Sequence, residues 1–149
     1  LGSGLFDMGG LEAAGVRTAL ATDIGGGTSY SMLRTLDEGY KVLQLQRQRM
    51  DPLTAFWRIT LGNAAALGLE DRIGTLAIGS EADLVVLNPA ATPAMALRHE
   101  TVRMLSDELF LLQTMGDDRA VSAVYVAGKR TAETEDGPTG AQADRVEAI

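Results

Sequence analysis

The sequence lacks cysteine entirely and contains a single histidine, His99, among its 149 residues. Without cysteine, the chain can form neither a disulfide framework nor a thiolate metal site. A catalytic zinc site ordinarily takes three protein ligands, and histidine is the commonest of them. A self-contained metal hydrolase is therefore nearly excluded, unless most of its site lies elsewhere. His99 stands between two charged residues in a stretch of no clear period, so we expect a solvated surface histidine.

Basic residues and long apolar runs are also scarce. The formal net charge is −7, and an acidic chain repels phosphate backbones, so we expect no nucleic-acid partner. No apolar run approaches the roughly 20 residues that span a bilayer, so we expect no membrane partner. No basic segment precedes an apolar one, and we expect no signal peptide. The absence of cysteine agrees with a reducing compartment, and we expect a cytoplasmic protein. The chain opens at Leu1 in loop-like sequence, so we expect further sequence upstream.

The first part of the chain alternates helical and apolar extended patterns. Residues 6–14 predict a short helix, and the apolar run 16–21 between glycines predicts a buried strand. Together they form the helix-to-strand step of a parallel sheet. Three further helices are predicted. The first spans about 31–48, the second runs from 51 to a break at Gly62 and Asn63, and the third covers 64–67 and is closed by Gly68.

The second part has a different character. Residues 72–79 look like a turn-rich β segment, and residues 84–87 (LVVL) predict a buried strand. Residues 90–102 are predicted as a loop and residues 106–115 as a helix. A strand at 121–126 then turns back through Gly128 and Lys129 to a short strand at 130–131.

We therefore divide the chain into residues 1–68, residues 69–131 and a polar tail over 132–149, which we expect to be loosely ordered. The fold class is α/β, but neither of the first two parts closes a sheet alone. Natural folds avoid unpaired strand edges. The missing strands must come from upstream sequence or from another chain.

Asp23 is the sharpest candidate for chemistry. It follows the predicted strand 16–21 directly, and the carboxyl ends of parallel strands are where active sites are built. A carboxylate there can ligate a metal or carry protons. The alternative is a turn aspartate that caps the following loop, since Asp-x-Gly is ordinary turn chemistry.

The triple glycine at 25–27 lacks the lysine and spacing of a P-loop and the pattern of a dinucleotide fingerprint. It indicates a close backbone approach or a sharp turn beside a pocket, with a plain flexible loop as the alternative. Ser29 and Ser31 have no histidine near them in the sequence, so a serine nucleophile has no support.

Several segments resemble guanine deaminases of the amidohydrolase superfamily. They are LGSGLFD at 1–7, ATDIGGGTSYSM at 21–32, GLEDRIG at 68–74, GSEADLVVL at 79–87, GDDR at 116–119 and YVAG at 125–128. The resemblance covers about residues 1–131. The ADLV stretch is shared widely across amidohydrolases, whereas the TDIGGGTS run is far more specific to guanine deaminases.

The resemblance implies the carboxy-terminal part of a distorted (β/α)8 barrel, together with part of a small β-sandwich built from both chain ends. Residues 16–22 would be the eighth barrel strand. Asp23 would be both a zinc ligand and the catalytic carboxylate that helps move a proton between water and the purine. The implied reaction converts guanine, a small-molecule purine substrate, to xanthine and ammonia. We also expect a homo-oligomer.

The chain departs from that family in its histidines. The family's histidine ligands, its acid/base glutamate and the residues that hold the purine have no counterpart here, and His99 matches no ligand position. We therefore expect the 149-residue chain alone to be inactive and to retain no zinc. Three alternatives stay open: another amidohydrolase such as a triazine or cytosine deaminase, a non-catalytic binding or assembly module, and a fragment stable only as a strand-exchanging oligomer.

Overall fold

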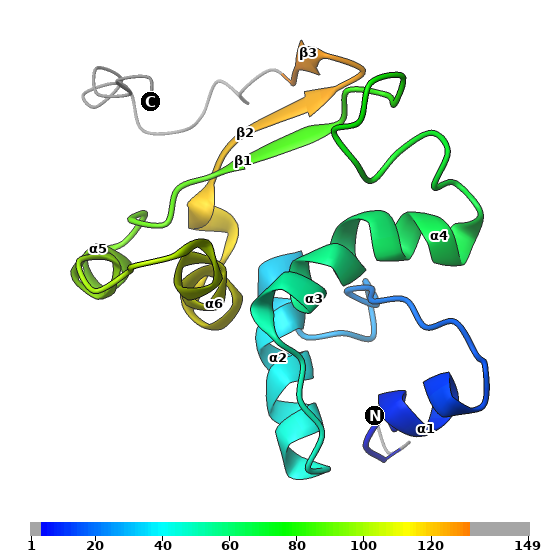
Figure 1. The fold of residues 1–149 in the computed structure, drawn as a ribbon. Coiled ribbons are helices and arrows are strands. Elements are labelled where there is room, and N and C mark those ends of the chain that lie inside the picture. The colour runs from blue at the N-terminus through cyan, green and yellow to red at the C-terminus, as the bar shows by residue number, and fades with distance from the viewer. Residues whose placement is uncertain (1–3, 132–149) are drawn as a thin grey trace.

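A computed structural model describes residues 4–131 of the chain. The helices are α1 (Met8–Ala13), α2 (Met32–Leu45), α3 (Pro52–Trp57), α4 (Asn63–Leu67), α5 (Pro93–His99) and α6 (Leu105–Met115); a π-helical turn, Arg58–Gly62, joins α3 to α4, and a 3-10 turn, Asp118–Ala120, follows α6. The strands are β1 (Leu84–Leu87), β2 (Val121–Val126) and β3 (Lys129–Arg130). In Figure 1, the strands lie at the top, α1 to α4 lie below them, and α5 and α6 lie to the left.

None of the helices within residues 4–131 has both the length and the apolar character that crossing a lipid bilayer requires.

The first three helices begin where their capping residues predict. Asp7, Ser31 and Asp51 each accept a hydrogen bond from the backbone N–H three residues further on. Such a bond satisfies a donor that the first turn of a helix leaves unpaired. Pro52 follows Asp51 at the first turn, where its missing N–H costs nothing. The predictions of a helix in each of these three places are confirmed.

The prediction of a strand at residues 16–21 is wrong within the described residues 4–131. This run is extended and has no assigned secondary structure. The described sheet contains only β1, β2 and β3. A strand takes its hydrogen bonds from a neighbouring strand, so an apolar run without such a neighbour stays irregular. Consequently Asp23 does not follow a sheet strand in this structure.

The predicted helix break is present but lies at Thr60, two residues before Gly62, where two helical stretches meet at a kink ahead of α4. Thr60 has φ −123° and ψ −105°, outside the helical region, and absorbs the irregularity. A Cβ at Gly62 would lie 2.9 Å from the Trp57 ring, so the turn needs glycine there. Gly68, with φ 70°, closes α4 in the left-handed conformation as predicted.

Residues 90–102, predicted as a loop, contain the helix α5. Thr92 caps it by accepting a hydrogen bond from Met95 N, and Pro93 occupies its first turn. The predicted helix at 106–115 is confirmed as α6, although its start at Leu105 has no side-chain cap. Residues 72–79 form turns and no strand.

The strands form an antiparallel sheet in the order β1-β2-β3. Leu84 stands opposite Tyr125, and the register shifts between Val86 and Leu87. The hairpin between β2 and β3 is tied to the segment before β1, because Asp83 Oδ1 accepts a hydrogen bond of 2.8 Å from Ala127 N. The strand positions 84–87 and 121–126 are confirmed. The predicted burial of 84–87 is not, since Val85 and Val86 are 58% and 47% exposed.

Two apolar clusters hold these elements together. The first contains Met8, Leu36, Leu43, Met50 and Ala55, with Leu20, Phe56 and Ile59 against it. The second contains Leu33, Met95, Leu111, Leu112 and Ala120, with Phe56, Leu87, Ala91, Val102 and Met115 against it. Phe56 touches both clusters, and α6 packs against both α2 and α3. The helices therefore form the base on which the extended segment 16–23 and the sheet each rest.

Candidate functional site

Asp23 lies at the end of the extended segment, with an exposed side chain and φ 52°. Aspartate is one of the few residues that tolerate this left-handed conformation. Its carbonyl oxygen accepts hydrogen bonds from Gly26 N at 2.9 Å and Gly27 N at 2.5 Å. Asp23 therefore makes a turn through its backbone, while Ser31 provides the side-chain cap of α2. The Asp23 carboxylate is left available for other chemistry.

The triple glycine gives Asp23 the space for this turn. A Cβ at Gly27 would lie 1.9 Å from the carbonyl oxygen of Thr22, a distance that no side chain tolerates. A Cβ at Gly26 would lie 2.6 Å from Asp23 Oδ2. The close backbone approach predicted for this loop is confirmed at Gly27.

Side chains from the helices hold the segment that leads to Asp23. Asn63 Nδ2 donates to the Leu20 carbonyl oxygen and Asn63 Oδ1 accepts from Leu20 N, each at 2.8 Å. Arg58 Nη1 donates to Thr18 Oγ1 at 3.1 Å, and Arg17 Nη1 donates to the carbonyl oxygen of Ala65 at 2.8 Å. These contacts come from the π turn and α4, and sequence reasoning missed both Asn63 and Arg58.

Glu12 completes the contact at Arg58. Its Oε1 accepts from Arg58 Nη2 at 2.5 Å and from Thr18 Oγ1 at 3.0 Å. The Arg58 side chain is only 11% exposed. The Glu12 side chain is 38% exposed, so this charged hydrogen bond remains open to water on one side, although it is stronger than a neutral one. Thr18 is thereby fixed both to Glu12 of α1 and to Arg58 of the π turn.

The start of α1 is fixed by a second polar group. Gln48 Nε2 donates to Asp7 Oδ1 at 2.6 Å, and Gln48 Oε1 accepts from Gly9 N at 3.0 Å. The Gly10 N–H and then the Gln48 amide hold the pKa of the Asp7 carboxyl below its usual range. This carboxylate belongs to a helix cap, so it is a structural group and carries no chemistry.

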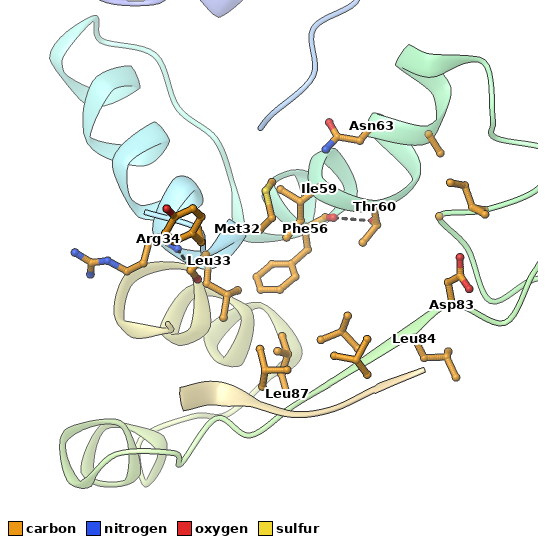
Figure 2. Close-up of a pocket in the computed structure, with 18 of the residues that line it drawn as sticks. Met32, Leu33, Arg34, Phe56, Ile59, Thr60, Asn63, Asp83, Leu84 and Leu87 are labelled. Carbon is orange, nitrogen blue, oxygen red and sulfur yellow. Dashed lines mark hydrogen bonds between the residues drawn. The ribbon is translucent and has the colours of Figure 1, made fainter. Parts of the chain in front are cut away.

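A cavity of about 1130 Å³ lies between the helices and the sheet. Its wall includes residues 28–34 at the start of α2, Phe56 and Ile59, and residues of β1 and β2. Figure 2 shows Phe56, Ile59 and Leu87 around it, with Asn63 and Asp83 at its polar edge. Ser29 and Ser31 line it, but Asp23 does not. The structure therefore brings the end of the glycine loop to the cavity and leaves the candidate carboxylate outside it.

His99 is the last residue of α5 and not part of a loop, contrary to prediction. Its Nε2 lies 3.5 Å from Glu108 Oε2, and its side chain is 39% exposed. Its surface position agrees with the expected solvated histidine. Among residues 4–131, no three His, Cys, Asp or Glu side chains lie close enough to hold a metal ion. These residues do not fit a zinc site by themselves, because Asp23 belongs to no group of three such side chains among them.

Comparison with known proteins gives a consistent match. The pattern of the Amidohydrolase family matches residues 1–132. The chain is 48% identical over 129 residues to guanine deaminase of Escherichia coli (strain K12), covering 87% of this chain and 29% of that protein. It is 35% identical over 141 residues to guanine deaminase of Mus musculus, covering 87% of this chain and 31% of that protein.

Solved structures agree. The structure of E. coli guanine deaminase superimposes with a TM-score of 0.85 at 47% identity, over 89% of this chain and 31% of that chain. An adenosine deaminase from Xanthomonas campestris with bound zinc gives a TM-score of 0.66 at 27% identity, over 80% of this chain and 26% of that chain. The chain thus spans less than a third of the length of each of these relatives.

Proposed function

The chain belongs to the amidohydrolase family, and we propose that it is the carboxy-terminal part of a hydrolase that deaminates guanine to xanthine and ammonia. The observation that carries this proposal is the 48% identity to E. coli guanine deaminase over 87% of the chain. It rests on sequence likeness over the same residues that form the Asp23 turn and the glycine loop.

For the fold of the whole protein, we propose that residues 1–68 are the last portion of a (β/α)8 barrel. Residues 69–131 would belong to a small composite β-sandwich, followed by the polar tail 132–149. The extended path of residues 16–22 supports this proposal, because a barrel strand has that shape and needs neighbours outside residues 4–131. The exposed Val85 and Val86 of β1 support it in the same way.

For Asp23 we propose two roles, as one ligand of a zinc ion and as a proton acceptor. Hydrolytic deamination adds water to the carbon that bears the amino group and releases that group as ammonia. The water must lose a proton and the leaving nitrogen must gain one. A carboxylate within reach of both can carry that proton. Its exposed side chain at the start of the glycine turn supports this role.

Zinc itself would supply an activated water at neutral pH. Most of its ligands must then lie outside residues 4–131, as must the groups that hold the purine. We accordingly propose that the 149-residue chain alone neither turns over guanine nor retains zinc, and that the active protein is a homo-oligomer. Deaminase activity or stoichiometric zinc in the homogeneous 149-residue chain would contradict this.

The test of the proposed function is Asp23→Asn in the intact protein that carries this chain. Asparagine tolerates φ near +52° as aspartate does, so the change removes the charge without straining the turn. We expect kcat for guanine to fall by about 100- to 10,000-fold, with reduced zinc content. The matched control is Asp71→Asn, an exposed carboxylate in the turns after α4, which should leave kcat unchanged.

The two rival functions predict different outcomes. A non-catalytic binding or assembly module predicts that Asp23→Asn leaves any turnover intact. Another amidohydrolase predicts a preferred substrate other than guanine, and the likeness to an adenosine deaminase makes this rival concrete. A panel of guanine, adenosine, cytosine and a triazine on the intact protein separates these outcomes, and turnover of guanine well above the others is the expected result.

A further inference from the structure

Leu20 is held by a single side chain in the manner of a strand partner. Asn63 offers its carboxamide edge to the Leu20 backbone, donating to the carbonyl oxygen and accepting from the N–H, both at 2.8 Å. A neighbouring strand offers one residue the same pair of bonds. Leu20 also packs against the first apolar cluster. The backbone three residues before Asp23 is therefore fixed both by polar bonds and by packing.

A kink between Arg58 and Asn63 lets one short stretch of chain contact this segment at two places. Arg58 and Asn63 are five residues apart, and in an unbroken α-helix such residues differ by about 140° around the axis. Thr60 lies between them with φ −123° and ψ −105°, outside the helical region, so the two side chains are not held at that angle. Arg58 therefore reaches Thr18 while Asn63 reaches Leu20, two residues further along the same segment.

We infer that Asn63, supported by Arg58, is a positioning residue that sets the location of the Asp23 carboxylate in the catalytic site. This inference rests on the proposed function, because it takes Asp23 to be a metal ligand and proton carrier. Asn63 acts only through the backbone of residues 20–23 and has no role of its own in the chemistry.

The location of Asp23 should be sensitive to the loss of the two Asn63 hydrogen bonds. Beyond Leu20 the chain passes through Thr22 directly into the Asp23 turn, and Gly27 closes on the Thr22 carbonyl oxygen. A displacement of Leu20 is therefore transmitted to Asp23 without a flexible linker between them. Partners that orient a metal ligand without touching the metal change metal affinity or activity by about 10- to 100-fold when removed. Asn63 is expected to behave in this way.

The experiment uses the intact protein with three changes. Asn63→Ala removes both bonds to Leu20, whereas Asn63→Asp keeps the acceptor for Leu20 N and loses the donor to the carbonyl oxygen. The control is Asn88→Ala, which removes an asparagine that accepts a comparable bond of 2.9 Å from Ala90 N, away from the segment. Three readouts are measured: kcat and KM for guanine, zinc affinity by competition with a chelator, and hydrogen exchange of the peptide covering residues 16–23.

For Asn63→Ala we expect kcat and zinc affinity to fall by about 10- to 100-fold, with KM changed less than kcat and with faster exchange over residues 16–23. Asn63→Asp sets a carboxylate oxygen against the Leu20 carbonyl oxygen, so its loss should be at least as large as that of Asn63→Ala, and Asn88→Ala should match the unchanged protein. If one of the two Asn63 variants does not fold, the loss in the other, folded variant carries the test.

Two negative results are distinguishable. If Asp23→Asn abolishes turnover but both folded Asn63 variants keep normal kcat and zinc affinity while residues 16–23 exchange faster, the positioning role is overturned and the proposed function stands. If Asp23→Asn itself keeps normal turnover, the proposed function fails, and the positioning role fails with it, whatever the exchange rates show.

Discussion

Residues 16–23 and strand β1 are both short extended segments, and the molecule holds them in different ways. β1 exchanges ladder hydrogen bonds with β2, a segment of the same chain. Residues 16–23 are held by the side chains of Asn63 and Arg58 instead. Each rests on a different apolar cluster, since Leu20 packs on the first and Leu87 on the second. β1 thus depends on a neighbouring strand of the same chain. Residues 16–23 stay extended without such a strand, because side chains hold them.

The comparison also bears on the candidate site. The ladder of β1 and β2 pairs Leu84, Val85 and Val86 in one register before it shifts at Leu87, so removing one contact leaves neighbouring pairs in place. The grip on residues 16–23 is concentrated in a few side chains, so each of them matters more. The candidate carboxylate, Asp23, lies at the end of the segment that is held in this concentrated way.

The largest expected effect comes from truncating one buried side chain in the apolar cluster beneath each segment. Leu36 is fully buried in the first cluster, and Met95 is 1% exposed in the second. We expect Leu36→Ala and Met95→Ala each to lower the free energy of unfolding by about 2–5 kcal/mol, measured by urea titration of the intact protein. Leu36→Ala should also speed hydrogen exchange over residues 16–23, whereas Met95→Ala should speed it over β1.

The control for this pair is Leu45→Ala, on the same helix as Leu36 but 72% exposed, which should change stability by less than about 0.5 kcal/mol. Equal acceleration of both segments by both buried changes would show that the two clusters act as one. The two segments would then not depend on separate apolar clusters for their stability.

The next effect concerns the turn at the end of residues 16–23. Gly27→Ala places a Cβ against the Thr22 carbonyl oxygen, so the loop must open and Asp23 must move. A displacement of about 1 Å at a catalytic group can lower a rate about 100-fold, and we expect a fall of this size in kcat of the intact protein. Gly26→Ala leaves the backbone of the turn in place but sets a Cβ 2.6 Å from Asp23 Oδ2, so it should lower kcat as well, through the carboxylate itself. Normal kcat in Gly27→Ala would show that the close approach is dispensable.

Local signals in the sequence account for the parts of the fold that were predicted correctly. Asp7, Ser31 and Asp51 each mark a helix start, because a cap acts within three residues of itself. The helix α5 was missed although Thr92 and Pro93 carry the same pair of signals as Asp51 and Pro52. That error is one of interpretation, since the information lies in the sequence.

Other features depend on partners that no local pattern reveals. The apolar run 16–21 has the composition of a strand, but its conformation is decided by whether a neighbouring strand is present. Asn63 bonds to Leu20 just beyond the kink at Thr60, and the sequence of residues 58–62 does not reveal where the chain turns. The sequence around Asp23 was enough to make it a candidate. The residues that hold its segment, Asn63 and Arg58, became apparent only in the three-dimensional structure.

The smallest expected effect concerns the N-terminal cap of α5. This helix lies near the second apolar cluster, on which β1 rests. Thr92→Ala removes the hydroxyl that accepts from Met95 N at 3.3 Å, leaving an N–H of the first turn without that partner. We expect the free energy of unfolding to fall by about 1 kcal/mol, measured by urea titration. Thr92→Ser keeps a hydroxyl in place and should lie within a few tenths of a kcal/mol of the unchanged protein. Equal losses in the two variants would mean that the methyl group of Thr92, through packing, matters more than its cap. Because the cap acts only on α5, hydrogen exchange over residues 16–23 should not change in either variant.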